Sequence, residues 1–108
     1  MVDLPARPGG MTHELADAWV REQCEALQLG FVHIRDSRAQ PDTLGFPDYL
    51  ICGRSLLLRE YKSPGDTLRP AQRAWRLALG RAGADYALWT PADLISGRAY
   101  HELLTIAY

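Results

Sequence analysis

Two short apolar runs separated by a tight turn constrain the fold of this chain more than any other feature. Residues 48–53 and 55–62 are rich in leucine, isoleucine and tyrosine, and the pair Gly53-Arg54 lies between them. Runs of this length bounded by turn formers are typical of β-strands, and their close spacing predicts a hairpin. We therefore expect a sheet that contains this hairpin.

Helical and strand patterns flank the hairpin. Apolar residues at helical spacing predict an amphipathic helix over residues 13–28, with Thr12 as its N-cap and Gly30 as its C′ residue. Pro70 suits the first turn of a second helix, over residues 70–82. The other expected elements are strands over 31–35 and 84–90, a short helix over 91–96, and a tail over 98–107 that fits a strand or a helix.

This order of elements predicts an α/β layer fold with a mixed central sheet of about four strands flanked by helices. A chain of 108 residues is long enough for one domain with a single core. Residues 1–11 are rich in proline and glycine, and we expect them to form a flexible N-terminal arm. Residues 12–108 are then a single domain.

Composition argues against several classes of protein. The longest apolar runs are far shorter than a membrane span, and no signal peptide pattern is present. Cys24 and Cys52 lack metal-ligand spacing, so we expect buried free thiols and a cytoplasmic location. The net charge of −1 is not the global basicity of many nucleic-acid-binding proteins, so DNA binding would depend on locally placed arginines.

Two acids and a lysine lie at the ends of the predicted hairpin strands. Asp48 opens the first strand, and Glu60 and Lys62 close the second. Because strand side chains alternate, Glu60 and Lys62 point to one face, which they share with Leu56 and Leu58. Carboxylates bind Mg²⁺ through oxygen, the ion activates water, and a lysine can orient the nucleophile or stabilise developing charge. The three residues therefore predict metal-assisted phosphodiester cleavage.

Simpler interpretations of the same residues stay open. Pro47 and Asp48 could only mark the turn before a strand, and Glu60 and Lys62 could be exposed on an edge strand. A buried acid, however, requires a partner or a metal, and the neighbouring leucines favour burial. The three histidines lack zinc-binding spacing, and the sequence has neither a glycine-rich phosphate loop nor a serine hydrolase motif.

Four motifs, taken in order, resemble the VRR-NUC domain, a branch of the PD-(D/E)xK nuclease superfamily. They are Asp-Ser-Arg at 36–38, Gly-Phe-Pro-Asp at 45–48, Glu-Tyr-Lys at 60–62 and Pro-Ala-Gln at 70–72. Residues 82–93 are also similar to the family's strand after the glutamine helix, so the resemblance covers about residues 12–97. It implies a restriction-endonuclease-like core and a DNA endonuclease that uses one or two Mg²⁺ or Mn²⁺ ions.

The resemblance also implies roles for individual residues. The implied catalytic residues are Asp48, Glu60, Lys62 and Gln72. The implied metal ligands are Asp48, Glu60, the backbone carbonyl of Tyr61, and Glu14 in the first helix, with Glu22 on a nearby face. The Tyr61 side chain should face away from Glu60, because adjacent strand residues alternate.

DNA contacts are expected from polar and basic residues near these motifs, since phosphate neutralisation supplies most DNA affinity. The candidates are Arg35, Ser37, Arg38, Arg69 and Arg73, although arginines on a helix are also compatible with a solvated face.

Stand-alone members of the family look like phage or bacterial proteins and are associated with homodimers that cut branched DNA such as Holliday junctions. We therefore expect a homodimer acting on DNA in a bacterial or phage-infected cell, without a nucleotide cofactor or a membrane. Leu103, Leu104 and Ile106 are candidates for the dimer interface. The alternatives are a restriction-type or weakly selective DNase and a catalytically silent DNA-binding module.

Overall fold

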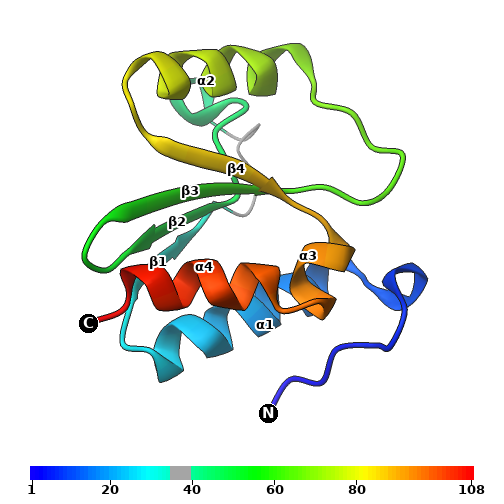
Figure 1. The fold of residues 1–108 in the computed structure, drawn as a ribbon. Coiled ribbons are helices and arrows are strands. Elements are labelled where there is room, and N and C mark those ends of the chain that lie inside the picture. The colour runs from blue at the N-terminus through cyan, green and yellow to red at the C-terminus, as the bar shows by residue number, and fades with distance from the viewer. Residues whose placement is uncertain (35–39) are drawn as a thin grey trace.

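The computed structural model describes residues 1–34 and 40–108 and shows a four-stranded sheet with helices on both faces (Figure 1). Strands β1, β2 and β3 are antiparallel neighbours, and β4 pairs in parallel with β3 at the far edge. The predicted α/β fold with a mixed sheet is confirmed. The strands are β1 (Gly30–His33), β2 (Tyr49–Cys52), β3 (Leu56–Tyr61) and β4 (Asp85–Trp89).

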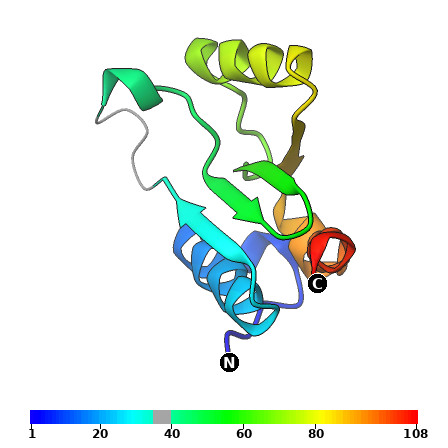
Figure 2. The ribbon, with the colours of Figure 1, turned by 90° about the vertical axis from the view of Figure 1, so that its left-hand side faces the viewer.

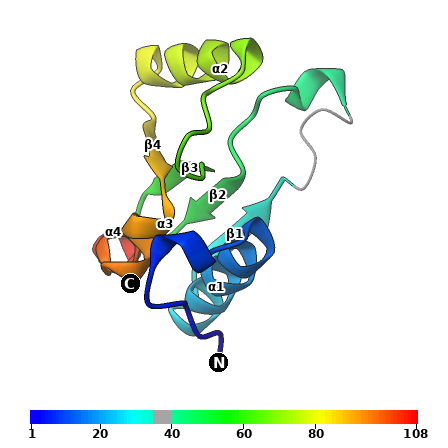
Figure 3. The same ribbon diagram turned by 90° about the vertical axis from the view of Figure 1, so that its right-hand side faces the viewer.

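The helices form two unequal layers. Three helices cover one face of the sheet, whereas α2 crosses the other face alone and connects the parallel strands β3 and β4 (Figure 2 and Figure 3). The helices are α1 (His13–Ala26), α2 (Pro70–Arg81), α3 (Pro91–Ile95) and α4 (Arg98–Ile106), with short 3-10 turns at Pro8–Gly10 and Pro41–Thr43.

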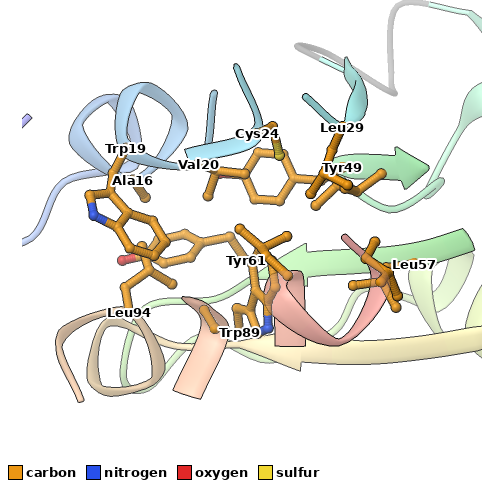
Figure 4. Close-up of a cluster of buried hydrophobic side chains, with 14 residues drawn as sticks. Ala16, Trp19, Val20, Cys24, Leu29, Tyr49, Leu57, Tyr61, Trp89 and Leu94 are labelled. Atoms are coloured by element: carbon orange, nitrogen blue, oxygen red, sulfur yellow. The ribbon is translucent and has the colours of Figure 1, made fainter. Parts of the chain in front are cut away.

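The hydrophobic core lies between the sheet and the layer of α1, α3 and α4 (Figure 4). Tyr49 and Ile51 of β2 and Leu57 and Tyr61 of β3 point into it, as strand alternation requires. The helices contribute small and branched side chains that fill the space between these rings: Ala16, Val20, Cys24, Leu94, Ala99 and Leu103.

The two cysteines have different surroundings. Burial raises the pKa of the Cys24 thiol to about 12, so Cys24 behaves as an unreactive core residue. Cys52 is exposed, and its predicted burial is wrong. It follows Ile51 in β2 and therefore points to the opposite face, which α2 covers only in part.

The ends of α1 are set by one predicted cap and one unexpected one. The Thr12 hydroxyl accepts a hydrogen bond from the Leu15 amide at 3.1 Å, as predicted. The helix ends at Ala26, earlier than expected, because Gln28 rather than Gly30 takes the left-handed conformation, with φ of 58°. The predicted C′ role of Gly30 is therefore wrong, and Gly30 begins β1.

The C-terminal tail is a helix that closes on the hairpin turn. The Arg54 amide donates to the Ile106 carbonyl at 2.7 Å, and a Cβ on Gly53 would lie 2.1 Å from that oxygen. Only glycine permits so close an approach. Leu103 and Ile106 are buried in the chain's own core, which corrects their expected place in a dimer interface; Leu104 is exposed.

Residues 1–11 lie against the domain, which differs from the expected flexible arm. Val2, Leu4 and Met11 pack on the core, and the Val2 amide donates to Glu22 at 2.5 Å. Within the described ranges, no helix has the length and apolar character needed to cross a membrane.

Candidate active site

The hairpin register brings Asp48 next to Glu60. Tyr49 pairs with Arg59, so Asp48, one residue earlier, lies beside Glu60 at the end of the hairpin away from the turn. Asp48 Oδ2 accepts a hydrogen bond from the Tyr61 amide at 2.8 Å, which fixes the carboxylate across the two strands. The register of the hairpin therefore brings the two acids together.

A glutamine from α2 connects Glu60 and Lys62. Gln72 Nε2 donates to Glu60 Oε2 at 3.1 Å, and Gln72 Oε1 accepts from Lys62 Nζ at 3.0 Å. Lys62 Nζ also lies 3.7 Å from Glu60 Oε2, so the predicted shared face of Glu60 and Lys62 is confirmed. Because Gln72 also accepts from the Arg69 amide at 2.8 Å, its side chain has one fixed orientation.

The choice of lysine at position 62 is distinctive in this chain. Lys62 is the only lysine, against eleven arginines. Its compact ammonium carries three donors, one of which goes to Gln72 Oε1, and it forms an ion pair with Glu60; its side chain is 14% exposed. An arginine here would present a larger, planar set of donors in place of this compact charge.

The loop before Asp48 holds α2 in position over the site. Gly45 has φ of +79° and approaches α2 so closely that a Cβ would lie 2.4 Å from the backbone of Ala71. Phe46 makes an edge-on contact with Trp75, and Trp75 Nε1 donates to the Leu44 carbonyl at 2.9 Å. The glycine of the Gly-Phe-Pro-Asp motif therefore allows the contact that places Gln72 beside Glu60.

Burial and mutual repulsion make the two acids costly to ionise. Glu60 has a side chain only 4% exposed, and burial together with the Asp48 charge raises its pKa to about 8, against the opposing effect of Lys62. Burial also raises the pKa of Asp48, opposed first by the Tyr61 amide. When both acids are ionised, two carboxylates face one ammonium, and a cation would stabilise the excess negative charge.

The first helix contributes Asp17 to this region, a residue that the sequence reasoning missed. The Tyr49 hydroxyl donates to Asp17 Oδ1, His33 Nε2 lies 3.4 Å from Asp17 Oδ2, and the Asp17 charge contributes to the raised pKa of Asp48. Glu14, the predicted residue, is exposed one turn earlier on α1. Both acids line a hollow of about 250 Å³ with Ala18, Arg21 and His33.

Tyr61 separates the site from the core. Its side chain is buried in the hydrophobic layer and faces away from Glu60, as predicted. The His13 ring stands edge-on against it, 5.1 Å between centroids. The Tyr61 hydroxyl is buried and has no hydrogen-bond partner among the described residues. The metal-binding role of the Tyr61 carbonyl stays a prediction.

The donor set fits magnesium better than a transition metal. In residues 1–34 and 40–108, no three or more His, Cys, Asp or Glu side chains are grouped so as to hold a metal ion. Magnesium keeps several waters and is usually bound through one or two carboxylates, which Asp48 and Glu60 supply. Glu14 stays a predicted ligand whose side chain is not gathered with these two in such a group.

The expected DNA-binding residues divide into two groups. Arg69 and Arg73 are exposed at the start of α2, next to Gln72. Arg35, Ser37 and Arg38 lie outside the described residues. Comparison of the chain with protein-family models, with curated proteins and with solved structures finds no match.

Proposed function

We propose that this chain is a Mg²⁺-dependent endodeoxyribonuclease with a restriction-endonuclease-like core, acting on branched DNA such as Holliday junctions. The observation that carries the proposal is the buried Glu60 carboxylate, held by Gln72 and Lys62 beside Asp48. A buried acid pair with a raised pKa in this setting is typical of a site that works with a bound cation.

The residues that would hold the ion are Asp48 and Glu60, with the Tyr61 carbonyl and Glu14 suggested by the resemblance to VRR-NUC domains. When bound, Mg²⁺ activates a water and offsets the charge that develops on the phosphate. Oxygen donors alone suit this hard ion. The same cation would favour the ionised form of both acids, whose pKa values are raised without it.

The chain's own residues position the reacting groups. Lys62 is partly exposed, so its ammonium can reach a phosphate oxygen or the attacking water while Gln72 Oε1 holds it at 3.0 Å. Gln72 fixes Glu60 through its other end. Preorganised charges of this kind need not reorient during the reaction, which is the main electrostatic advantage of an enzyme over water.

Branched DNA and a homodimer are the preferred substrate and assembly because two sites would be needed to cut both strands. A domain this small has little surface for reading bases, so recognition through backbone and shape suits it. A general DNase and a silent binding module are the outcomes against which the proposal is tested.

The first experiment incubates the protein with a labelled four-way junction, a flap and a linear duplex, each with Mg²⁺, Mn²⁺ or EDTA. Metal-dependent cuts in the junction or the flap but not in the linear duplex would support the proposal, and paired cuts in the junction would support the homodimer. Cleavage of all three substrates would indicate a general nuclease, and no cleavage would favour the binding module.

Variants of the single lysine sharpen this test. Lys62→Ala and Lys62→Arg should both lower the cleavage rate, by about 10²–10³-fold, because neither places a compact ammonium at Gln72. Arg54→Ala, in the exposed turn at the opposite end of the hairpin, is the matched control and should cleave at the normal rate. Normal activity in Lys62→Ala would contradict the proposed role.

A further inference from the structure

Positive charge is concentrated in one short segment. Residues 69–81 contain four arginines and no acid, although the chain as a whole has a net charge of −1. The rest of the chain therefore carries −5. No ion pair joins Arg69, Arg73, Arg76 or Arg81 to a described acid. These charges thus remain available to a polyanion.

Three of these arginines, Arg73, Arg76 and Arg81, border a groove that leads to the candidate active site. One hollow, of about 490 Å³, extends from Lys62 along the loop 63–68 to Arg73 and Arg76. A second, of about 530 Å³, shares Leu68, Arg73 and Arg76 with the first and continues to Arg81. The groove between the loop and α2 is therefore continuous from the catalytic lysine to the far end of the helix.

Leucine side chains lie among the arginines, and the loop 63–68 adds polar residues to the lining, including the acid Asp66. Leu77 is 55% exposed on α2, and Leu68 and Leu88 line the groove below it. Arg73 Nη1 donates to the Leu68 carbonyl at 2.6 Å, which ties the loop to the helix. Contact with a leucine side chain does not stabilise a bound phosphate, but it does stabilise the exposed face of an unstacked base.

A second copy of the chain is a poor occupant for this groove. Any isologous contact through α2 would bring like-charged arginine rows together, and like charges across an interface are unfavourable. A duplex exposes phosphates and sugars but keeps its base faces stacked. An unpaired strand presents both phosphates for the arginines and bases for the leucines.

We propose that the groove between residues 63–68 and α2 binds an unpaired segment of DNA and leads it to Lys62. The inference rests on the proposed nuclease function and specifies its substrate: a branch that has an unpaired stretch next to the cut. Arg76, Arg81 and Leu77 become binding residues that the motifs do not mark.

Binding is measured without cleavage, so that the two proposals can fail separately. Fluorescence anisotropy in EDTA compares a labelled 12-nucleotide single strand with a duplex of the same length, over a range of salt concentrations. We expect tighter binding of the single strand. Arg76→Gln should lower the slope of log affinity against log salt by about 0.7, the value for one phosphate contact on single-stranded DNA.

Leucine variants test the apolar part of the lining. Leu77→Gln should weaken single-strand binding by about fivefold, since covering the exposed part of a leucine side chain removes apolar surface from water at roughly 25 cal/mol per Å². Leu104→Gln, at a similarly exposed leucine on α4, is the matched control and should bind normally.

Three outcomes would overturn the inference. The first is equal binding of duplex with no effect of Leu77→Gln, which would indicate a backbone track for duplex. The second is no binding of either DNA. The third is a change from dimer to monomer in Leu77→Gln, seen by sedimentation at unchanged DNA affinity. Single-strand binding without any cleavage would instead support the proposed binding groove and contradict the proposed nuclease activity.

Discussion

The face of the sheet under α1, α3 and α4 and the face under α2 are held by different kinds of contact. Helix α4 is nine residues long and buries Ala99, Leu103 and Ile106 in the core. Helix α2 is longer, twelve residues, yet its one buried residue is Gln72. The first layer is attached by fully buried apolar packing, whereas the second is attached through the polar Gln72 and through half-buried contacts such as Phe46 against Trp75.

The difference indicates that one helical layer contributes mainly to stability and the other mainly to the candidate site. Apolar packing supplies most folding free energy, so the layer with α1 and α4 carries the stability of the domain. The α2 layer leaves Leu77 exposed and directs its polar side chains to the acids and the groove. Stability and the proposed chemistry are therefore separable by mutation, and the following predictions test that separation.

The largest contrast should come from one leucine on each face. Leu103→Ala removes a fully buried side chain and should lower the free energy of unfolding by about 2–5 kcal/mol. Leu77→Ala, its matched control on α2, should change stability by less than about 0.5 kcal/mol. Urea unfolding of both variants measures the difference. Equal losses would show that α2 is as much a part of the core as α4.

Alanine substitutions at two glycines with similar backbone conformations should also differ in their effect on stability. Gly45 (φ +79°) and Gly83 (φ +77°) both carry a strain penalty for alanine, but only Gly45 faces a neighbour, Ala71. Gly83→Ala should cost about 1 kcal/mol. Gly45→Ala should cost more and, because it displaces Gln72, should also slow cleavage. Thermal unfolding and cleavage rates of both variants provide the test, and full activity in Gly45→Ala would break the link between the loop and the site.

A third contrast is the pH dependence of stability in EDTA, which is spread over several pH units. Between the ordinary glutamate pKa of 4.5 and about 8, folded Glu60 holds a proton that the unfolded chain has lost. Stability should therefore fall as pH rises through this window, by at most about 1.4 kcal/mol per pH unit. Melting temperatures should show a shallower slope in Glu60→Gln and a larger gain from Mg²⁺ at pH 8 than at pH 5.5. An unchanged slope in the variant would assign the effect elsewhere.

Local patterns in the sequence predicted most of the fold. Strand alternation placed Glu60 and Lys62 on one face and Tyr61 on the other, because that pattern depends only on neighbouring residues. The cap at Thr12 was likewise a local signal.

The errors involve contacts between residues far apart in the chain. Asp17 was missed because its partners, His33 and Tyr49, are strand residues whose positions the helix pattern cannot reveal. The helical spacing of Ala71, Trp75 and Ala78 predicts α2 correctly, but Ala78 is exposed because no further element covers that face among the described residues. The role of Gly45 also required the approach of α2 to be known.

The parallel crossover from β3 through α2 to β4 has a consequence for how the domain folds and opens. Gln72 bonds to partners only 10 and 12 residues away, whereas Tyr108 reaches the Gly53 carbonyl across 55 residues. Short-range contacts form with little loop-closure entropy, and weakly packed units open below the global unfolding free energy. Hydrogen exchange should therefore be faster in α2 than in α4. Local unfolding of α2 would then remove Gln72 from the candidate site and return it while the rest of the molecule stays folded.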